Sequence, residues 1–270
     1  MKKIATILLA FCVFNLNAQK AFFGSQNNEP ARVVQSALAP FIISNGLVVN
    51  LDANYSNSYS GTGAIWYDIA GSNNGTITGG TFVNAGGVSF FNFLNLNVAS
   101  YVSVPHTKTA SMTFSVWAKS NSVPVPNTML FNAGVSGSGP DFFIVGTNFL
   151  WNTWDSYNTP YKDNNNVDLN HNLIITNINW HNYSVVVDAV ANNTKFYFDG
   201  VFKGTSNYWT PLRSSATAFY LGGAGLNGSG NSDNTWNFIG GIAAFLSYNR
   251  VLTQSEITAN FNATKSRYGL

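Results

Sequence analysis

A short run of aromatic and polar side chains near the middle of the sequence could bind a sugar. The run extends from Phe149 to Asn158 and contains two tryptophans and a tyrosine. Sugar sites combine a flat aromatic ring, which stacks on the C–H face of a pyranose, with side chains that hydrogen-bond its hydroxyls. The residues here that could supply both are Asn152, Trp154, Asp155, Tyr157 and Asn158. We take these five as the candidate carbohydrate site.

The spacing within this run predicts which of its side chains face outward. Successive side chains of a strand point to opposite faces, so Asn152 and Trp154 share one face while Trp151 and Thr153 share the other. We expect the face of Asn152 and Trp154 to be the exposed one. The alternative is that both tryptophans pack in the core or against the sheet, where large aromatic side chains are highly buried on average.

An oxygen-rich segment, 163–168, follows this run and could bind calcium. Ca²⁺ takes about 6–8 oxygen ligands, and the candidates here are Asp163 and Asp168. The segment lacks the glycine and the final glutamate of an EF-hand loop. The alternative is that these side chains cap turns in a solvated loop. The histidines, His106, His171 and His181, are too scattered to form a transition-metal motif.

The count of carboxylates predicts that the protein is not an enzyme. Glycoside hydrolysis generally uses two carboxylates across the scissile bond. Beyond residue 18 the only glutamates are Glu29 and Glu256. Glu29 precedes the strand-rich region, and Glu256 fits a helix capping box that begins at Thr253. A hydrolase that uses only aspartates remains the alternative.

The first residues are typical of a secretory signal peptide. Lys2 and Lys3 precede a short apolar run, Ile4–Phe14, and a small residue, Ala18, ends a plausible cleavage site. The run is too short to span a membrane. We predict a signal peptide at 1–18, a leader or linker at 19–44, one domain at 45–270, and a protein that is secreted or held at the cell surface.

Composition excludes several other classes. The only cysteine, Cys12, lies in the predicted signal, and the bulky Phe11 before it argues against a lipoprotein. The chain has 13 Lys+Arg and 11 Asp+Glu, so removal of Lys2 and Lys3 leaves 11 of each. No basic stripe or polybasic amphipathic segment is present. Nucleic-acid binding and membrane-surface binding are therefore not expected.

Alternating apolar residues and closely spaced turn residues predict an all-β domain. In the run 113–118, Phe114, Val116 and Ala118 share one face and Trp117 points to the other. The expected strands cover 47–53, 88–93, 101–104, 112–118, 128–132 and 142–145. Asn74–Gly75 indicates a tight turn. The capping box at 253–256 predicts one C-terminal helix, with Ile257 and Phe261 packing on the sandwich.

Several motifs together resemble one known family. They are Trp-His-Asn-Tyr at 180–183, Phe-Asp-Gly at 198–200, Gly-Gly-Ile-Ala-Ala at 240–244 and Tyr-Asn-Arg-Val-Leu at 248–252. An opening Leu-Val-Val-Asn-Leu-Asp-Ala at 47–53 adds to them. This order resembles the laminin-G-like, concanavalin A-like lectin and glucanase domains of bacterial and phage type. The resemblance covers roughly 46–270.

The resemblance implies a concanavalin A-like jelly-roll β-sandwich of two antiparallel sheets with a short C-terminal helix. It also implies a glycan-binding or adhesive role, with calcium as a candidate cofactor. The Glu-x-Asp-x-x-Glu strand of the glucanases on this fold is absent. Many relatives carry an acidic residue in the strand where this chain has Ala243 and Ala244. That departure weakens any transfer of acidic site chemistry and leaves the fold prediction unchanged.

Three functions are consistent with these observations. The first is a secreted, non-catalytic carbohydrate-binding or adhesive module, with or without calcium. The second is a structural or protein-interaction module on the same fold without a sugar site, and the third is a glycoside hydrolase acting on polysaccharide. The expected partner is a glycan or cell-surface polysaccharide, with envelope proteins as further candidates, and no transmembrane segment is expected.

Overall fold

The structure is a computed structural model that divides the chain into two compact units, Met1–Leu38 and Ala39–Leu270. It describes residues 41–94, 99–105, 109–122, 128–132, 140–145, 148–153, 168–169, 177–206, 218–223 and 237–270, all in the second unit. The predicted signal peptide, 1–18, and most of the predicted leader, 19–40, lie outside the described residues.

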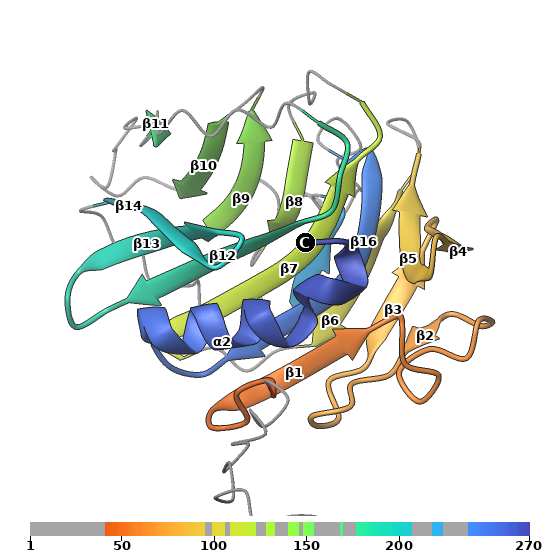
Figure 1. The fold of residues 1–270 in the computed structure, drawn as a ribbon, viewed down its shortest axis with the longest axis horizontal. Helices are drawn as coiled ribbons and strands as arrows, with labels where there is room; N and C mark the ends of the chain where they lie inside the picture. Colours follow the sequence, from red (N-terminus) through yellow and green to blue (C-terminus); the bar gives the residue numbers. More distant parts are fainter. Residues whose placement is uncertain are drawn as a thin grey trace, which may run out of the picture. The chain divides into compact units, whose positions relative to one another are not determined.

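One of the two antiparallel sheets, sheet A, carries the C-terminal helix on its outer face (Figure 1). Its strand order is β14-β13-β12-β7-β16-β5-β4, and β1 pairs with the second half of β16. The strands are β1 (Leu47–Asp52), β4 (Thr81–Ala85), β5 (Val88–Phe93), β7 (Met112–Ser120), β12 (His181–Asp188), β13 (Asn193–Phe198), β14 (Val201–Ser206) and β16 (Gly240–Tyr248).

The other sheet, sheet B, carries the segment that precedes the candidate sugar residues. Its order is β11-β10-β9-β8-β15-β6-β3-β2. The strands are β2 (Ile65–Trp66), β3 (Gly75–Thr78), β6 (Tyr101–Pro105), β8 (Thr128–Asn132), β9 (Pro140–Val145), β10 (Asn148–Thr153), β11 (Asp168–Leu169) and β15 (Ala218–Leu221). The predicted β-sandwich of two antiparallel sheets is confirmed.

The hydrophobic core lies between the two sheets and follows the predicted alternation. Phe114, Val116 and Ala118 are fully buried in it, whereas Trp117 belongs to a separate cluster on the outer face of sheet A. The ring of Phe114 lies 5.0 Å, centroid to centroid, from that of Phe219 on sheet B. Burial of each Val or Phe side chain contributes about 1.5–3 kcal/mol relative to an exposed one.

The predicted C-terminal helix is confirmed together with its cap. Helix α2 (Gln254–Thr264) begins after Thr253, whose Oγ1 accepts from the backbone N–H of Glu256 at 3.3 Å. The Glu256 carboxylate accepts in return from the Thr253 N–H at 2.9 Å and from Arg250 at 2.6 Å. A 3₁₀ turn, η2 (Lys265–Tyr268), follows directly. These bonds satisfy backbone donors that the first helical turn leaves unpaired.

Helix α2 lies over β12, β7 and β16 on the outer face of sheet A (Figure 1). Ile257 is buried beneath it, and the ring of Phe261 stacks on Trp117 at 5.7 Å, as predicted. Trp117 also stacks on Tyr268 of η2 at 3.9 Å. Among the residues that the structure describes, no helix is long and apolar enough to cross a membrane.

The predicted tight turn at Asn74–Gly75 is wrong. Gly75 is the first residue of β3 and pairs with Trp66 of β2, so the connecting loop is longer than a two-residue turn. The Asn74 side chain instead accepts from the backbone N–H of Asp68 at 2.9 Å. A Cβ on Gly75 would lie 2.7 Å from Val102, so close packing accounts for the glycine.

The segment just before β1 is tied to the C-terminal part of the chain. The hydroxyl of Tyr248 donates to the Ile43 carbonyl at 3.0 Å, and the Ile43 N–H donates to Asn260 of α2 at 2.8 Å. Arg250 donates to the Asn45 carbonyl at 2.9 Å. Residues 43–45 are therefore fixed against sheet A and its helix.

Candidate functional site

A row of mainly polar positions crosses the face of sheet B that is turned away from the core. Directly opposite residues of antiparallel strands lie on the same face. Tyr220 of β15 pairs with Ser103 on one side and Asn132 on the other. Asn132 pairs with Asp141 of β9, and Asp141 pairs with Asn152 of β10. The row ends two residues before Trp154.

The neighbouring row shows that this face is the outer one. Phe131 belongs to the core cluster between the sheets and pairs with the position of Phe142, which pairs with that of Trp151. Position 151 is therefore on the core side of sheet B, and position 152 is on the outer side. The expectation that the face of Asn152 and Trp154 is exposed stays a prediction.

Most of the predicted sugar residues cannot be placed in the same way. Trp154, Asp155, Tyr157 and Asn158 lie outside the described residues. The structure brings Asn152 to the end of β10 and onto the outer face, beside the position of Asp141. The sugar-binding role of the five residues stays a prediction.

Two tyrosines stand on the same outer face. The ring of Tyr101 on β6 meets that of Tyr220 edge-on, with centroids 5.4 Å apart. Burial, with a smaller contribution from Tyr101, raises the pKa of Tyr220 above its usual value. The Tyr220 hydroxyl therefore stays protonated at neutral pH and can both donate and accept a hydrogen bond. This is the kind of group that a sugar hydroxyl pairs with.

The predicted calcium ligands are only partly placed. Asp168 lies in β11, opposite Leu150 of β10, and so on the same face as Asn152, whereas Asp163 lies outside the described residues. In the described part of the chain, no three His, Cys, Asp or Glu side chains gather as a metal site would require. Calcium binding through Asp163 and Asp168 stays a prediction.

His181 has a structural environment at one end of sheet A. Its Nδ1 lies 2.8 Å from Asp199 and its Nε2 lies 3.1 Å from Asn177, while the ring stacks on Phe198 at 4.6 Å. Asp199 also accepts from the Asn182 N–H at 2.8 Å. These contacts join the start of β12 to the turn that follows β13. Both ring nitrogens are thus engaged by neighbouring side chains.

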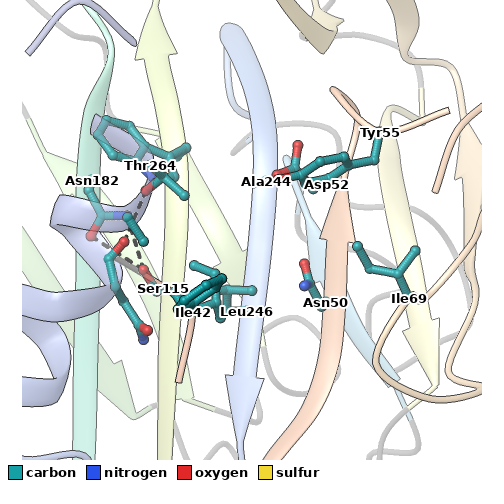
Figure 2. A pocket seen from close by; sticks show the side chains of 14 residues that line it. Ile42, Asn50, Asp52, Tyr55, Ile69, Ser115, Asn182, Ala244, Leu246 and Thr264 are labelled. Atoms are coloured by element: carbon teal, nitrogen blue, oxygen red, sulfur yellow. Dashed lines mark hydrogen bonds between the residues drawn. The ribbon is translucent and has the colours of Figure 1, made fainter. Parts of the chain in front are cut away.

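A pocket of about 340 Å³ lies between helix α2 and the outer face of sheet A (Figure 2). Its floor consists of two cross-strand rows that span β1, β16, β7 and β12. The rows are Asn50–Leu246–Ser115–Ser184 and Asp52–Ala244–Trp117–Asn182. All of these except Ser184 line the pocket, together with Phe41, Ile42, Tyr55, Ile69, Asn260, Ala263 and Thr264.

The centre of the floor is a buried polar network. The amide of Asn182 donates to the Ser115 hydroxyl at 3.0 Å. The Ser184 hydroxyl lies 3.0 Å from both the Ser115 hydroxyl and the Asn182 side-chain oxygen, and it can donate to one of them at a time. These three side chains are no more than 5% exposed. All are neutral, so the floor offers hydrogen-bonding groups without charge.

At the other edge of the pocket an ion pair joins β1 to η2. Arg267 donates to the Asp52 carboxylate at 2.6 Å and to the Tyr55 hydroxyl at 3.0 Å. The Asp52 side chain is 6% exposed. Its charge is therefore compensated, and the pocket as a whole is close to neutral.

Sequence reasoning did not find this pocket. The sequence does contain one signal for it, because polar residues recur at alternate positions of otherwise apolar strands. An example is Ser115, between Phe114 and Val116. That pattern indicates a face turned away from the core. It does not show that a helix more than a hundred residues later covers the face.

Comparison with protein families places the chain in a known superfamily. The family described as the concanavalin A-like lectin/glucanases superfamily matches residues 96–258, which is more than half of the chain. No curated protein sequence matches significantly.

Solved structures show the same fold at low sequence identity. Domain 4 of AbnA, an extracellular arabinanase from Geobacillus stearothermophilus, in complex with arabinotriose, is 20% identical, with a TM-score of 0.56 over 78% of this chain and 96% of that one. The binding domain of Paraclostridial Mosquitocidal Protein 1 is 16% identical, with a TM-score of 0.57 over 82% of this chain and 52% of that one.

A sialidase from Trypanosoma rangeli is 15% identical, with a TM-score of 0.55 over 82% of this chain. The match covers 34% of the sialidase, so this chain spans about a third of that protein. The fold is thus shared by enzymes and by binding domains.

Proposed function

Because this chain belongs to the concanavalin A-like lectin/glucanase superfamily, we propose that it is an exported, non-catalytic carbohydrate-binding module. Its sugar site lies on the outer face of sheet B, where β10 leads into Trp154. The predicted signal peptide at 1–18 supports export to the cell surface or the medium.

The observation that carries this proposal is the cross-strand row that ends at Asn152. Ser103, Tyr220, Asn132 and the position of Asp141 continue it across the sheet. A sugar chain needs successive donors and acceptors on one face. In this row Ser103 and Tyr220 are partly exposed and Asn132 is fully buried, so we expect the sugar contacts at Tyr220 and at Asn152 rather than at Asn132. Trp154 and Tyr157, which follow directly, would add the aromatic rings on which pyranose faces stack.

The extent of one structural match supports a binding role. The chain covers nearly the whole of the arabinanase domain, which was solved with arabinotriose. It covers only about a third of the sialidase. A domain-sized match to a saccharide-bound domain favours a binding module over a complete enzyme.

The test is a glycan array with residues 19–270, comparing wild type with Trp154→Ala and Asn152→Ala. Both variants should lose at least about tenfold in affinity, since removal of a stacking ring or a buried hydrogen bond typically costs 1.4 kcal/mol or more. Thr81→Ala, an exposed position on β4 of sheet A, is the control and should bind as wild type does. Folding of each variant is checked by near-UV circular dichroism.

A repeat of the array in EDTA tests the calcium proposal. Loss of binding in EDTA, restored by Ca²⁺ and weakened by Asp168→Asn, would support calcium-assisted recognition near β11. Equal binding in EDTA would remove calcium from the proposal. A blank array with folded wild type would contradict the lectin function itself.

A protein-interaction role is the second candidate, because β14 exposes apolar side chains. Val201 and Phe202 are 56% and 47% exposed on this strand, which lies at the end of sheet A in the described part of the chain. Exposed apolar residues on an edge strand favour association with another chain. A blank array together with concentration-dependent self-association, lost in Phe202→Ser, would favour this second function.

A further inference from the structure

We propose that the pocket beneath helix α2 is a second binding site, which takes a single neutral sugar ring. It lies on the outer face of sheet A and shares no residue with the face proposed above for glycan binding. The inference therefore goes beyond the proposed function and does not depend on it.

The pocket has room for such a ligand because the helix is held away from the sheet. On one side Trp117 stacks on Phe261 and Tyr268 and donates to Thr264 at 3.0 Å. On the other side Asn260 donates to the Tyr248 hydroxyl at 3.0 Å. Trp117, Asn260 and Thr264 all line the pocket, whose volume of about 340 Å³ is at the lower end of the range of about 300–1,000 Å³ that ligand pockets occupy.

Ala244 is the residue that leaves this space open. It lies in the floor between Asp52 and Trp117, directly opposite each of them on the neighbouring strands. Any longer side chain at this position would extend from the floor into the pocket. The small residue in this row thus determines the volume beneath the helix.

The chemistry of the floor suits hydroxyl groups better than it suits packing. A buried polar group is costly unless it is hydrogen-bonded, and Ser115 and Asn182 are satisfied by each other and by Ser184. Their remaining lone pairs could still accept hydrogen bonds from ligand hydroxyls. Here Ser115 and Asn182 are 5% and 3% exposed and face the pocket. Asn50 adds a half-buried amide, whose side chain makes no hydrogen bond to any residue in the described part of the chain.

The charge of the pocket and the residues at its rim further limit the kind of ligand that it can bind. The Asp52 carboxylate is paired with Arg267 at 2.6 Å, so no uncompensated charge would attract an ion. Tyr55 and Phe41, 47% and 71% exposed, bring aromatic rings to the lining. Neutral donors and acceptors on the floor, with aromatic and aliphatic walls, match a ring that has hydroxyls on its edge and C–H groups on its faces.

The probe is a panel of methyl glycosides of common hexoses and pentoses, titrated into residues 19–270 and followed by NMR and calorimetry. At least one should bind saturably with a Kd on the order of 1 mM. Ala244→Leu, which fills the pocket, should weaken that binding at least about tenfold, and Asn50→Ala should weaken it as well. Tyr55→Ala should also weaken it, whereas Tyr67→Ala, equally exposed at 50% and outside the lining, should not.

Four results would overturn the proposal. They are no saturable binding of any methyl glycoside by folded wild type, unchanged binding in Ala244→Leu, unchanged binding in both Asn50→Ala and Tyr55→Ala, and equally tight binding of the open-chain polyol xylitol. If Ala244→Leu does not fold, Asn50→Ala and Tyr55→Ala decide the outcome.

Two further experiments distinguish this pocket from the proposed site on sheet B. They also show whether the bound ring is a free sugar or the end of a sugar chain. Trp154→Ala should abolish array binding and leave methyl glycoside binding intact, so failure of one proposal is distinguishable from failure of the other. Oligosaccharides that end in the preferred sugar should bind as tightly as the methyl glycoside if the site takes the end of a chain. Much weaker oligosaccharide binding would restrict the site to free monosaccharides.

Discussion

Asp52 and Arg267 lie near opposite ends of the described chain, and their side chains meet at 2.6 Å. The Asp52 carboxylate also accepts from the Asn54 N–H and side-chain amide, at 3.0 Å each. In the described part of the chain, the guanidinium of Arg267 is the only cation that forms an ion pair with this carboxylate.

Arg267→Ala should destabilise the domain by about 3 kcal/mol, because it leaves a buried carboxylate without its partner. Ser266→Ala, an exposed change in the same 3₁₀ turn, is the matched control and should stay within about 0.5 kcal/mol of wild type. Urea unfolding followed by tryptophan fluorescence measures both. A difference of less than about 1 kcal/mol between the two variants would show that the ion pair contributes little.

Single residues also show what alternation alone can predict. The sequence placed Phe114 inward and Trp117 outward, because side chains of a strand alternate regardless of what the strand pairs with. The same rule led us to expect Asn152 on an exposed face, which stays a prediction. It could not show that Asn152 continues a row through Asp141, Asn132 and Tyr220, since that row depends on pairings between distant strands.

At the scale of elements, helix α2 was predictable because its signals are local. The capping box from Thr253 to Glu256 lies within four residues of sequence. The pocket beneath the helix was not predictable for the opposite reason. It requires β1, β16, β7 and β12 to be neighbours, and it requires Trp117 to hold the helix through Thr264, which is 147 residues away. The Asn74–Gly75 signal failed because the Asp68 loop uses Asn74 as an acceptor.

The cap of α2 should make stability depend on pH at the acidic end. The hydrogen bond from Arg250 lowers the pKa of Glu256 from 4.5 to about 2. Because the folded-state pKa is lower than the unfolded one, ionised Glu256 stabilises the fold above pH 4.5, and this contribution is lost as the pH falls towards 2.

Glu256→Gln should therefore cost about 1 kcal/mol at neutral pH, and the difference from wild type should shrink as the pH falls towards 2. Thr253→Ala removes a cap without removing a charge, so its cost should change less over the same interval. Denaturant unfolding across a pH series measures both variants. If the difference in unfolding free energy between wild type and Glu256→Gln does not change with pH, the ionisation of Glu256 does not contribute to stability.

At the scale of the whole molecule, the C-terminal residues cover apolar side chains on the outer face of sheet A. Trp117 and Leu246 are both buried on the outer face of sheet A, each within a cluster that includes C-terminal residues. The helix and the 3₁₀ turn thus complete the second hydrophobic layer of the domain.

Deletion of residues 254–270 should abolish cooperative folding, because it exposes this layer and removes the partner of Asp52 in the same step. The expected result is aggregation or a broad, non-cooperative unfolding transition, observed by calorimetry and near-UV circular dichroism. A soluble truncated chain that unfolds as cooperatively as wild type would show that sheet A is stable without its helix.

The pairing of β1 with β16 has a consequence for how the chain is made. The first strand of sheet A finds its neighbour only in the last one, about 200 residues later along the chain. During synthesis, at about 5–20 residues per second, the first strand leaves the ribosome many seconds before its partner exists. Translation thus delays closure of the sheet until the C-terminal strand emerges. For a polypeptide that we propose to be exported, that delay would keep the nascent chain loose enough to be threaded through a translocation channel.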